Sequence, residues 1–179
     1  MRKPLSPHRK RIVTGAACAA ALAGGSLGLS APTAVADTVS VGYTCTGPGA
    51  PGGVQPLKVS VTAPADVPRG GTADLTVEVT TSLTAPLDLS ARSVTGEMRI
   101  DLGGTATGSV TATGFTNPAR IPSGTPVSLT GGKASVTLDS EGTATFAPGE
   151  AAVHVFGVTV TCTVSGTAPV AATTRVTSA

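Results

Sequence analysis

Apolar and polar residues alternate one by one along much of this chain, and this alternation constrains the fold more than any other feature. In residues 57–63, 75–79, 98–102 and 158–164, every second residue is apolar and most of the residues between them are polar. Successive side chains of a β-strand point to opposite faces. Each segment is therefore expected to form a strand with one buried face.

Turn-forming residues separate these segments. Gly and Pro recur at 47–53, 64–71, 122–124 and 148–149, and no segment after residue 36 has helical apolar spacing over several turns. Many short strands separated by turns are typical of two packed sheets. The sequence predicts an all-β fold, an immunoglobulin-like antiparallel β-sandwich of about 7–9 strands. The chain has no tryptophan, so "immunoglobulin-like" describes the architecture and not an antibody-type domain.

The N-terminal segment has the pattern of an export signal. Basic residues precede an apolar stretch from Ile12 to about residue 29, and the small-x-small sequence 34–36 comes before Asp37. The sequence predicts a signal peptide over 1–36, cleaved on the general secretory route, and a single domain over 37–179. A retained membrane anchor and a lipid-anchored Cys18 are the disfavoured alternatives, because the stretch is rich in small residues and Gly15 stands where a lipoprotein signal needs leucine.

Removal of the signal changes the charge of the protein. Five of the 12 basic residues precede Asp37, which leaves seven against ten acidic residues, a net charge of −3. No basic patch for nucleic acid remains, and no second apolar segment predicts a membrane contact after cleavage. The expected location is therefore extracellular, in the medium or held non-covalently at the cell wall.

Two cysteines remain after cleavage, and both lie in phase with apolar strand positions. Cys45 follows Val41 and Tyr43, and Cys162 follows Val158 and Val160, at spacings of two. Exported proteins fold under oxidising conditions, so the pair predicts a disulfide. The bond is expected to cross the β-core, with the first strand either beside the Cys162 strand or directly across the core from it.

Short motifs in the same regions resemble a known family. They are Tyr43-Thr44-Cys45, Gln55-Pro56 before Leu57, the Gly70-Gly71 turn and Val160-Thr161-Cys162. This arrangement resembles uncharacterised secreted immunoglobulin-like β-sandwich domains of actinobacteria, a domain family of unknown function. The resemblance implies an exported immunoglobulin-like fold, and it carries over no catalytic residues because the family has none established.

Candidate catalytic and metal-binding residues are few. His154, the only histidine after residue 36, alternates with Val153 and Val155, and no GxSxG nucleophile motif is present. One histidine and two oxidised cysteines leave too few ligands for a zinc site, and the acidic turn 139–142 lacks the spacing of a calcium loop. We expect a surface histidine, no catalytic site, no metal and no cofactor.

The most distinctive loop runs from Phe115 to Gly124, with Pro118 and Pro122 around Arg120 and Ile121. Phe115 is the aromatic residue most expected to be exposed, whereas the strand pattern does not decide the face of Phe156. Phe115, Arg120 and Ile121 form a possible interaction loop, since prolines reduce the entropy lost on binding. The favoured alternative is an ordinary connection between sheets with Ile121 packed inward.

These observations indicate a secreted, non-enzymatic structural or interaction domain with an unidentified protein or cell-wall partner. A secreted enzyme inhibitor and a cell-wall glycan-binding module are the alternatives. The absence of tryptophan disfavours glycan stacking, although it leaves glycan binding by hydrogen bonds open.

Overall fold

The computed structural model describes residues 34–179, and this part of the chain is all-β, without a helix. The strands are β1 (Ala34–Thr46), β2 (Val54–Pro64), β3 (Asp66–Pro68), β4 (Gly71–Thr84), β5 (Val94–Gly104), β6 (Ser109–Thr116), β7 (Pro126–Leu138), β8 (Gly142–Val155), β9 (Val158–Val164) and β10 (Ala172–Thr177). Apart from its last three residues, the predicted signal peptide lies outside the described residues, as does Cys18. No membrane-spanning helix is found in residues 34–179.

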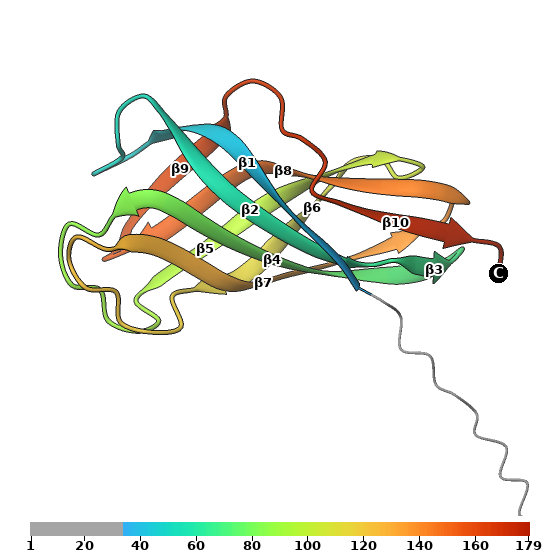
Figure 1. Cartoon of the computed structure of the whole chain (residues 1–179), viewed down its shortest axis with the longest axis horizontal. Helices are drawn as coiled ribbons and strands as arrows, with labels where there is room; N and C mark the ends of the chain where they lie inside the picture. Colours follow the sequence, from blue (N-terminus) through green and yellow to red (C-terminus); the bar gives the residue numbers. More distant parts are fainter. Residues whose placement is uncertain (1–33) are drawn as a thin grey trace, which may run out of the picture. The chain divides into compact units, whose positions relative to one another are not determined.

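All ten strands belong to one hydrogen-bonded sheet, in the order β3-β10-β8-β5-β6-β7-β4-β2-β1-β9 (Figure 1). Strand β9 also pairs with β8. The pairings therefore form a closed circuit, which runs from β8 through β5, β6, β7, β4, β2, β1 and β9 and returns to β8. Only the pairing of β3 with β10 is parallel. The all-β prediction is confirmed, whereas the immunoglobulin-like sandwich is not, because the strands form one sheet.

Two glycines explain why the pairing continues from β6 to β7. Gly114 and Gly131 both have positive φ, at 88° and 83°, and a Cβ on either one would lie close to the carbonyl oxygen of the other. Glycine reaches this conformation without steric conflict and permits a close approach of two backbones. Strands β6 and β7 therefore pair with each other at a sharp bend of the sheet, here called the β6–β7 corner. In a sandwich, these two strands would be unpaired edges of two different sheets.

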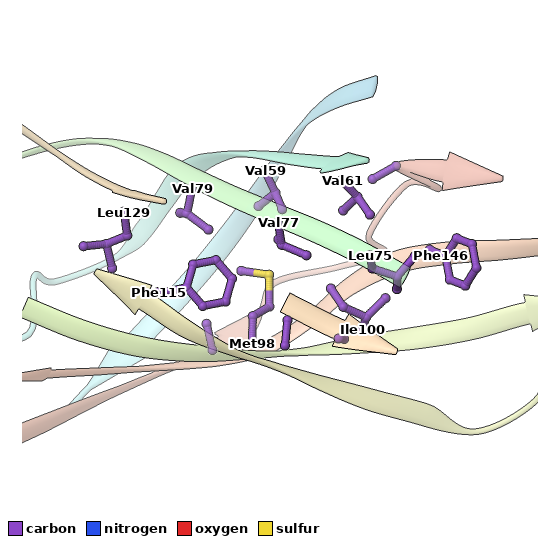
Figure 2. Packing of buried hydrophobic residues seen from close by; sticks show 14 of the residues in the cluster. Val59, Val61, Leu75, Val77, Val79, Met98, Ile100, Phe115, Leu129 and Phe146 are labelled. Carbon is purple, nitrogen blue, oxygen red and sulfur yellow. The ribbon is translucent and has the colours of Figure 1, made fainter. Parts of the chain in front are cut away.

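The alternating apolar residues point into the space that the strands enclose, as the sequence predicts, and face one another there. Side chains of β2 and β4 pack toward those of β5, β6 and β8 (Figure 2). Fully buried members include Val59, Val61, Val77, Ile100 and Phe146. One continuous core thus runs along the strands.

The two ends of the domain differ in what covers them. At one end, here called the closed end, β3 and β10 add strands beside β8, and Leu75, Ile100 and Phe146 fill the interior. The other end, the loop end, carries the β1–β2, β4–β5, β6–β7 and β8–β9 connections (Figure 1). Strand β1 begins and β10 ends at the closed end, where Ala34 pairs with Pro64 and Thr177 with Pro68.

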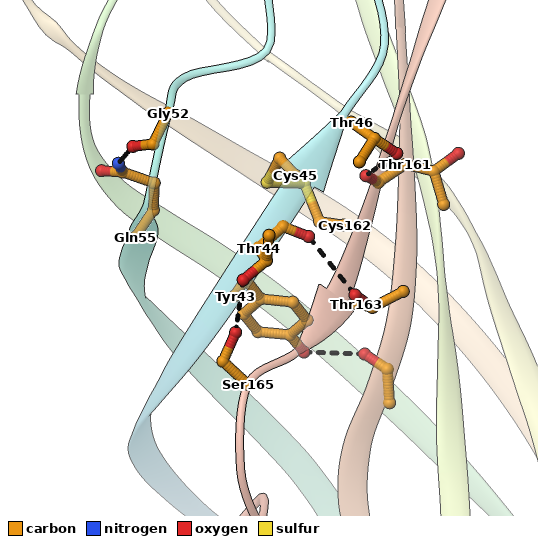
Figure 3. The surroundings of a disulfide bond; sticks show 11 residues. Tyr43, Thr44, Cys45, Thr46, Gly52, Gln55, Thr161, Cys162, Thr163 and Ser165 are labelled. Atoms are coloured by element: carbon orange, nitrogen blue, oxygen red, sulfur yellow. Dashed lines mark hydrogen bonds between the residues drawn. A yellow bond between two sulfur atoms is a disulfide. The ribbon is translucent and has the colours of Figure 1, made fainter.

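The predicted disulfide between Cys45 and Cys162 is present, with Cα atoms 4.0 Å apart (Figure 3). The two cysteines are direct partners in the antiparallel β1–β9 pairing, which comprises four residue pairs. The expectation that the bond crosses the core is wrong, and the alternative of adjacent strands is confirmed. The bond therefore reinforces the short seam at which the sheet returns to β8.

Tyr43 lies two residues before this bond and is fully buried. Its hydroxyl donates a hydrogen bond of 2.8 Å to the carbonyl oxygen of Gly149 in β8 (Figure 3). Burial, and then the negative charge of Asp101, raise the pKa of the Tyr43 phenol far above its usual range. Tyr43 is therefore a neutral hydrogen-bond donor that joins β1 to β8 through the core.

Candidate functional site

An apolar cavity of about 310 Å³ opens at the loop end of the domain. Deep in this cavity lie Leu57, Met98, Phe115 and Leu129, and the Cys45–Cys162 disulfide forms part of the wall. Figure 2 shows Leu129 and Phe115 at one end of the core, Phe146 at the other, and Met98 between them. The cavity is thus the unfilled end of the same core.

Small residues in two neighbouring strands border this volume. Gly96 of β5 and Ala151 of β8 both line the cavity, and Ala151 is the register partner of both Met98 and Cys162. A Cβ at Gly96 would lie 3.0 Å from the carbonyl oxygen of Ala152, so a larger residue there would require the neighbouring backbone to shift. At the closed end, the corresponding strands carry Ile100 and Phe146, which fill the interior.

The cavity offers no free polar side chain. Among its lining residues, only Thr81 and Glu97 are polar. The Thr81 hydroxyl accepts a hydrogen bond from the backbone N–H of Leu83 and donates one to its carbonyl oxygen. Glu97 is exposed between buried Gly96 and Met98, so its side chain points to the outer face of β5. The interior is therefore suited to a hydrocarbon group.

Two exposed apolar side chains stand at the mouth of the cavity. Phe156, between β8 and β9, is 65% exposed, and Leu87, between β4 and β5, is 48% exposed, and both line the cavity. Large apolar side chains left in water at the rim of an apolar hollow are typical of binding sites. The cavity and these two residues form the candidate site.

The structure places Phe115 in this site, but not where the sequence predicts it. The side chain is only 2% exposed, so the expectation of an exposed aromatic anchor is wrong. Gly114 adds one residue to β6 opposite the Gly96–Glu97 step of β5, and this bulge turns Phe115 inward. Its ring then lies over Gly132, where a Cβ would come within 2.2 Å of it.

The other two residues of the predicted interaction loop do not join the cavity. Ile121 is 9% exposed and exchanges two backbone hydrogen bonds of 2.9 Å with Leu89, which confirms the inward packing. Arg120 is exposed and forms an ion pair with Asp88. The structure does not bring Phe115, Arg120 and Ile121 together on one surface, and a partner for this loop stays a prediction.

This loop is braced against the β4–β5 connection. The Asp88 carboxylate accepts hydrogen bonds from the backbone of Ser123 and from Arg120, and these bonds lower the pKa of Asp88. The fully buried Asn117 side chain accepts from the Val94 N–H and donates to the carbonyl oxygens of Ser90 and Ala119. Both connections beside the cavity are therefore held in place by polar contacts.

His154 is exposed, as the sequence predicts, and its Nδ1 lies 2.9 Å from the Thr159 hydroxyl. Residues 34–179 hold no group of three or more His, Cys, Asp or Glu side chains that is placed to bind a metal ion. His154 and Thr159 are direct partners in the β8–β9 pairing, and this pairing explains the contact between their side chains.

The cavity itself was missed from the sequence, and so was the exposure of Phe156. One signal was available, because Phe156-Gly157 separates two alternating segments by two residues, which is the length of a tight hairpin. The cavity had no comparable signal, since its volume depends on how residues from different strands face one another.

Comparisons with known proteins find no matching family model, no matching curated protein and no matching solved structure. The fold and the site by themselves define an all-β domain with an apolar cavity at one end, bordered by an intrachain disulfide.

Proposed function

We propose that this chain is a secreted, non-enzymatic binding domain whose apolar cavity accepts the apolar part of a small molecule. The observation that carries this proposal is the 310 Å³ cavity without a free polar side chain at the loop end. Small-molecule sites are concave, mostly apolar and about 300–1,000 Å³ in volume. The cavity lies at the lower limit of that range and therefore suits a small ligand.

The surroundings of the cavity favour a small molecule over a protein partner. A stable protein interface buries about 800 Å² on each partner around an apolar centre. Among the described residues, the large exposed apolar side chains are Val54, Leu87, Phe156 and Val170, and only Leu87 and Phe156 line the cavity. This apolar rim is narrow, so most of the favourable contact is available inside the cavity.

Export is the second part of the proposal. It rests on the N-terminal pattern before Asp37 and is supported by the disulfide, because such bonds persist in oxidising compartments. The proposed place of action is the medium or the cell surface. We also propose membership of the actinobacterial family of secreted domains that the Tyr43-Thr44-Cys45 region resembles.

An immunoglobulin-like architecture for the fold belongs with that proposal. It is supported by two facing layers of antiparallel strands around one core (Figure 1). The β6–β7 and β8–β9 pairings depart from two separate sheets, because they join the two layers.

Binding of N-phenyl-1-naphthylamine, an uncharged fluorescent probe, tests the function. The purified domain should bind one probe molecule with increased fluorescence. Ala151→Leu extends a side chain from the cavity wall and should weaken probe binding by about tenfold or more. Ala147→Leu, the same change four residues earlier in β8 and outside the cavity lining, should leave binding unchanged.

Two outcomes would contradict the proposal. The first is a folded wild-type domain that binds no probe, and the second is equal binding by both variants. Thermal unfolding of each variant identifies a loss of fold. If the probe fails to bind but the domain co-sediments with purified peptidoglycan or inhibits an exported protease, the glycan-binding or inhibitor alternative replaces this function.

A further inference from the structure

Phe156 occupies an unusual backbone position at the tip of the β8–β9 hairpin. Val155 and Val158 pair directly, so Phe156 and Gly157 form a two-residue turn. Their φ angles are +50° and +78°, which is the pattern of a type I′ turn. The first position of this turn favours Asn, Asp or Gly, and a bulky residue with positive φ is an outlier.

Folding alone does not explain a phenylalanine at this position. Its side chain is 65% exposed, so it contributes little to the core, while its backbone conformation is unfavourable for an aromatic residue. Strained residues that persist in a structure cluster at functional sites. Phe156 also lines the cavity, as does the exposed Leu87 of the β4–β5 connection.

We propose that Phe156 is a ligand-binding residue and that the ligand is an amphiphile with a hydrocarbon chain. The chain fills the cavity, the Phe156 ring and Leu87 cover its outer part, and the polar end remains in solvent. This inference rests on the proposed function, and it adds the class of ligand and the residue at the mouth that contacts it.

The chemistry of the site supports this class. The walls provide Leu57, Val79, Met98 and Leu129 and no free hydrogen-bonding side chain, so a polar group inside would lose its hydration without replacement. Glu97 is the one charged residue in the cavity lining, and its side chain points to the outer face of β5. The polar end is therefore not selected by charge within the cavity.

Arg92 provides a matched control for the strained backbone. It is the other non-glycine residue with positive φ among residues 34–179, at 60°. It is exposed and lies in the β4–β5 connection, but it does not line the cavity. Asparagine adopts this conformation more readily than Phe or Arg, so Phe156→Asn and Arg92→Asn should both maintain or raise the melting temperature.

The experiment measures displacement of N-phenyl-1-naphthylamine by alkyl maltosides from octyl to tetradecyl, below their micellar concentrations. Affinity for the wild-type domain should rise about fourfold per methylene and level off when the cavity is full. Phe156→Asn should weaken maltoside binding by about tenfold without loss of stability. Phe156→Trp retains an aromatic ring and should bind more tightly than Phe156→Asn, and Arg92→Asn should bind as the wild type does.

The possible failures are distinguishable. If the wild-type domain binds neither probe nor maltoside, the proposed function itself is wrong. If it binds the probe but affinity does not depend on chain length, the amphiphile class is wrong. If Phe156→Asn binds as tightly as Arg92→Asn, the role of Phe156 is wrong and the cavity proposal stands.

Discussion

The closed end and the loop end of this domain are formed by the same long strands, yet they are filled differently. At the closed end, Leu75, Ile100 and Phe146 occupy the space between the layers, and β3 and β10 cover them. At the loop end, Gly96 and Ala151 occupy part of the wall, and a cavity remains. Alternation along a strand decides which side chains face inward, but side-chain volume decides whether the interior is full.

This difference separates stability from binding within one core. Packing at the closed end supports the fold, because Leu75, Ile100 and Phe146 are buried there and contribute dispersion contacts. At the loop end the core is less completely packed, and the unfilled space forms a concave apolar surface. Its walls depend on other supports, namely the Cys45–Cys162 bond and the polar contacts of Asn117 and Asp88.

The largest effect is expected from loss of the disulfide in the cavity wall. The bond closes a loop with a sequence separation of 117 residues, and replacement of both cysteines by serine should lower the free energy of unfolding by about 5 kcal/mol. Denaturant unfolding of the oxidised and double-serine proteins measures this difference, and thiol labelling of the denatured, unreduced protein controls for bond formation. Equal stabilities would show that the loop end does not depend on the bond.

Matched truncations compare the two ends directly. Phe146→Ala should destabilise the domain by about 3–5 kcal/mol, the usual range for a buried aromatic. Phe115→Ala should cost less, because one side of its ring already borders the cavity and has fewer neighbours to lose. Denaturant unfolding of both variants provides the comparison. An equal or larger cost for Phe115→Ala would indicate that the loop end is packed as fully as the closed end.

The polar support of the loop end predicts a smaller effect. Asn117→Ala leaves the buried Val94 N–H without its acceptor and should lower the free energy of unfolding by about 1–3 kcal/mol. Arg120→Ala, three residues further on, removes only an exposed ion pair and should not change stability measurably. Thermal unfolding of both variants tests this. Similar melting temperatures for Asn117→Ala and Arg120→Ala would show that the Asn117 hydrogen bonds do not stabilise the loop end.

The buried phenol of Tyr43, which joins β1 to β8, should make the free energy of unfolding depend on pH. This phenol ionises near pH 10 when unfolded, whereas burial raises its pKa in the folded state. The unfolded state therefore loses a proton that the folded state keeps, and Tyr43 contributes a loss of stability above about pH 10 of at most about 1.4 kcal/mol per pH unit. Tyr43→Phe should reduce this slope in urea unfolding at several pH values.

Because the chain has one tyrosine, phenolate absorbance follows the same group. The absorbance of the folded protein should begin to rise at a higher pH than that of the urea-unfolded protein. Coinciding titrations, or equal slopes for wild type and Tyr43→Phe, would mean that the phenol reaches solvent in the folded state.

Much of the fold was predictable because inward-facing residues recur every second position. This rule correctly places Tyr43, Cys45, Ile100 and Phe146 in the interior. The pairing of the two cysteines was predicted because no others follow residue 36. The alternation rule does not determine which strands are neighbours, so it left open whether the first strand lies beside the Cys162 strand or across the core from it, and the structure shows that the two strands are adjacent.

The candidate site was harder to predict, because it depends on departures from that rule. Gly114 introduces a bulge that reverses the phase of the following residue, so Phe115 points inward although the preceding alternation assigns it outward. Phe156 lies in a turn where no strand phase applies. The empty volume between Gly96, Ala151 and Leu129 becomes visible only when three separate strands are placed together.

The positions of the first and last strand ends determine how the cavity is oriented when the domain is attached to a surface or to another domain. Strand β1 begins and β10 ends at the closed end, away from the connections of the loop end (Figure 1), and two of these connections carry the cavity-lining residues Leu87 and Phe156. A tether or a fused domain attached at Ala34 or beyond Thr177 would therefore leave the molecule on the side opposite Phe156. Immobilised through either end, the domain would direct its cavity away from the support, an orientation that suits capture from the surrounding solution and surface-based binding assays alike.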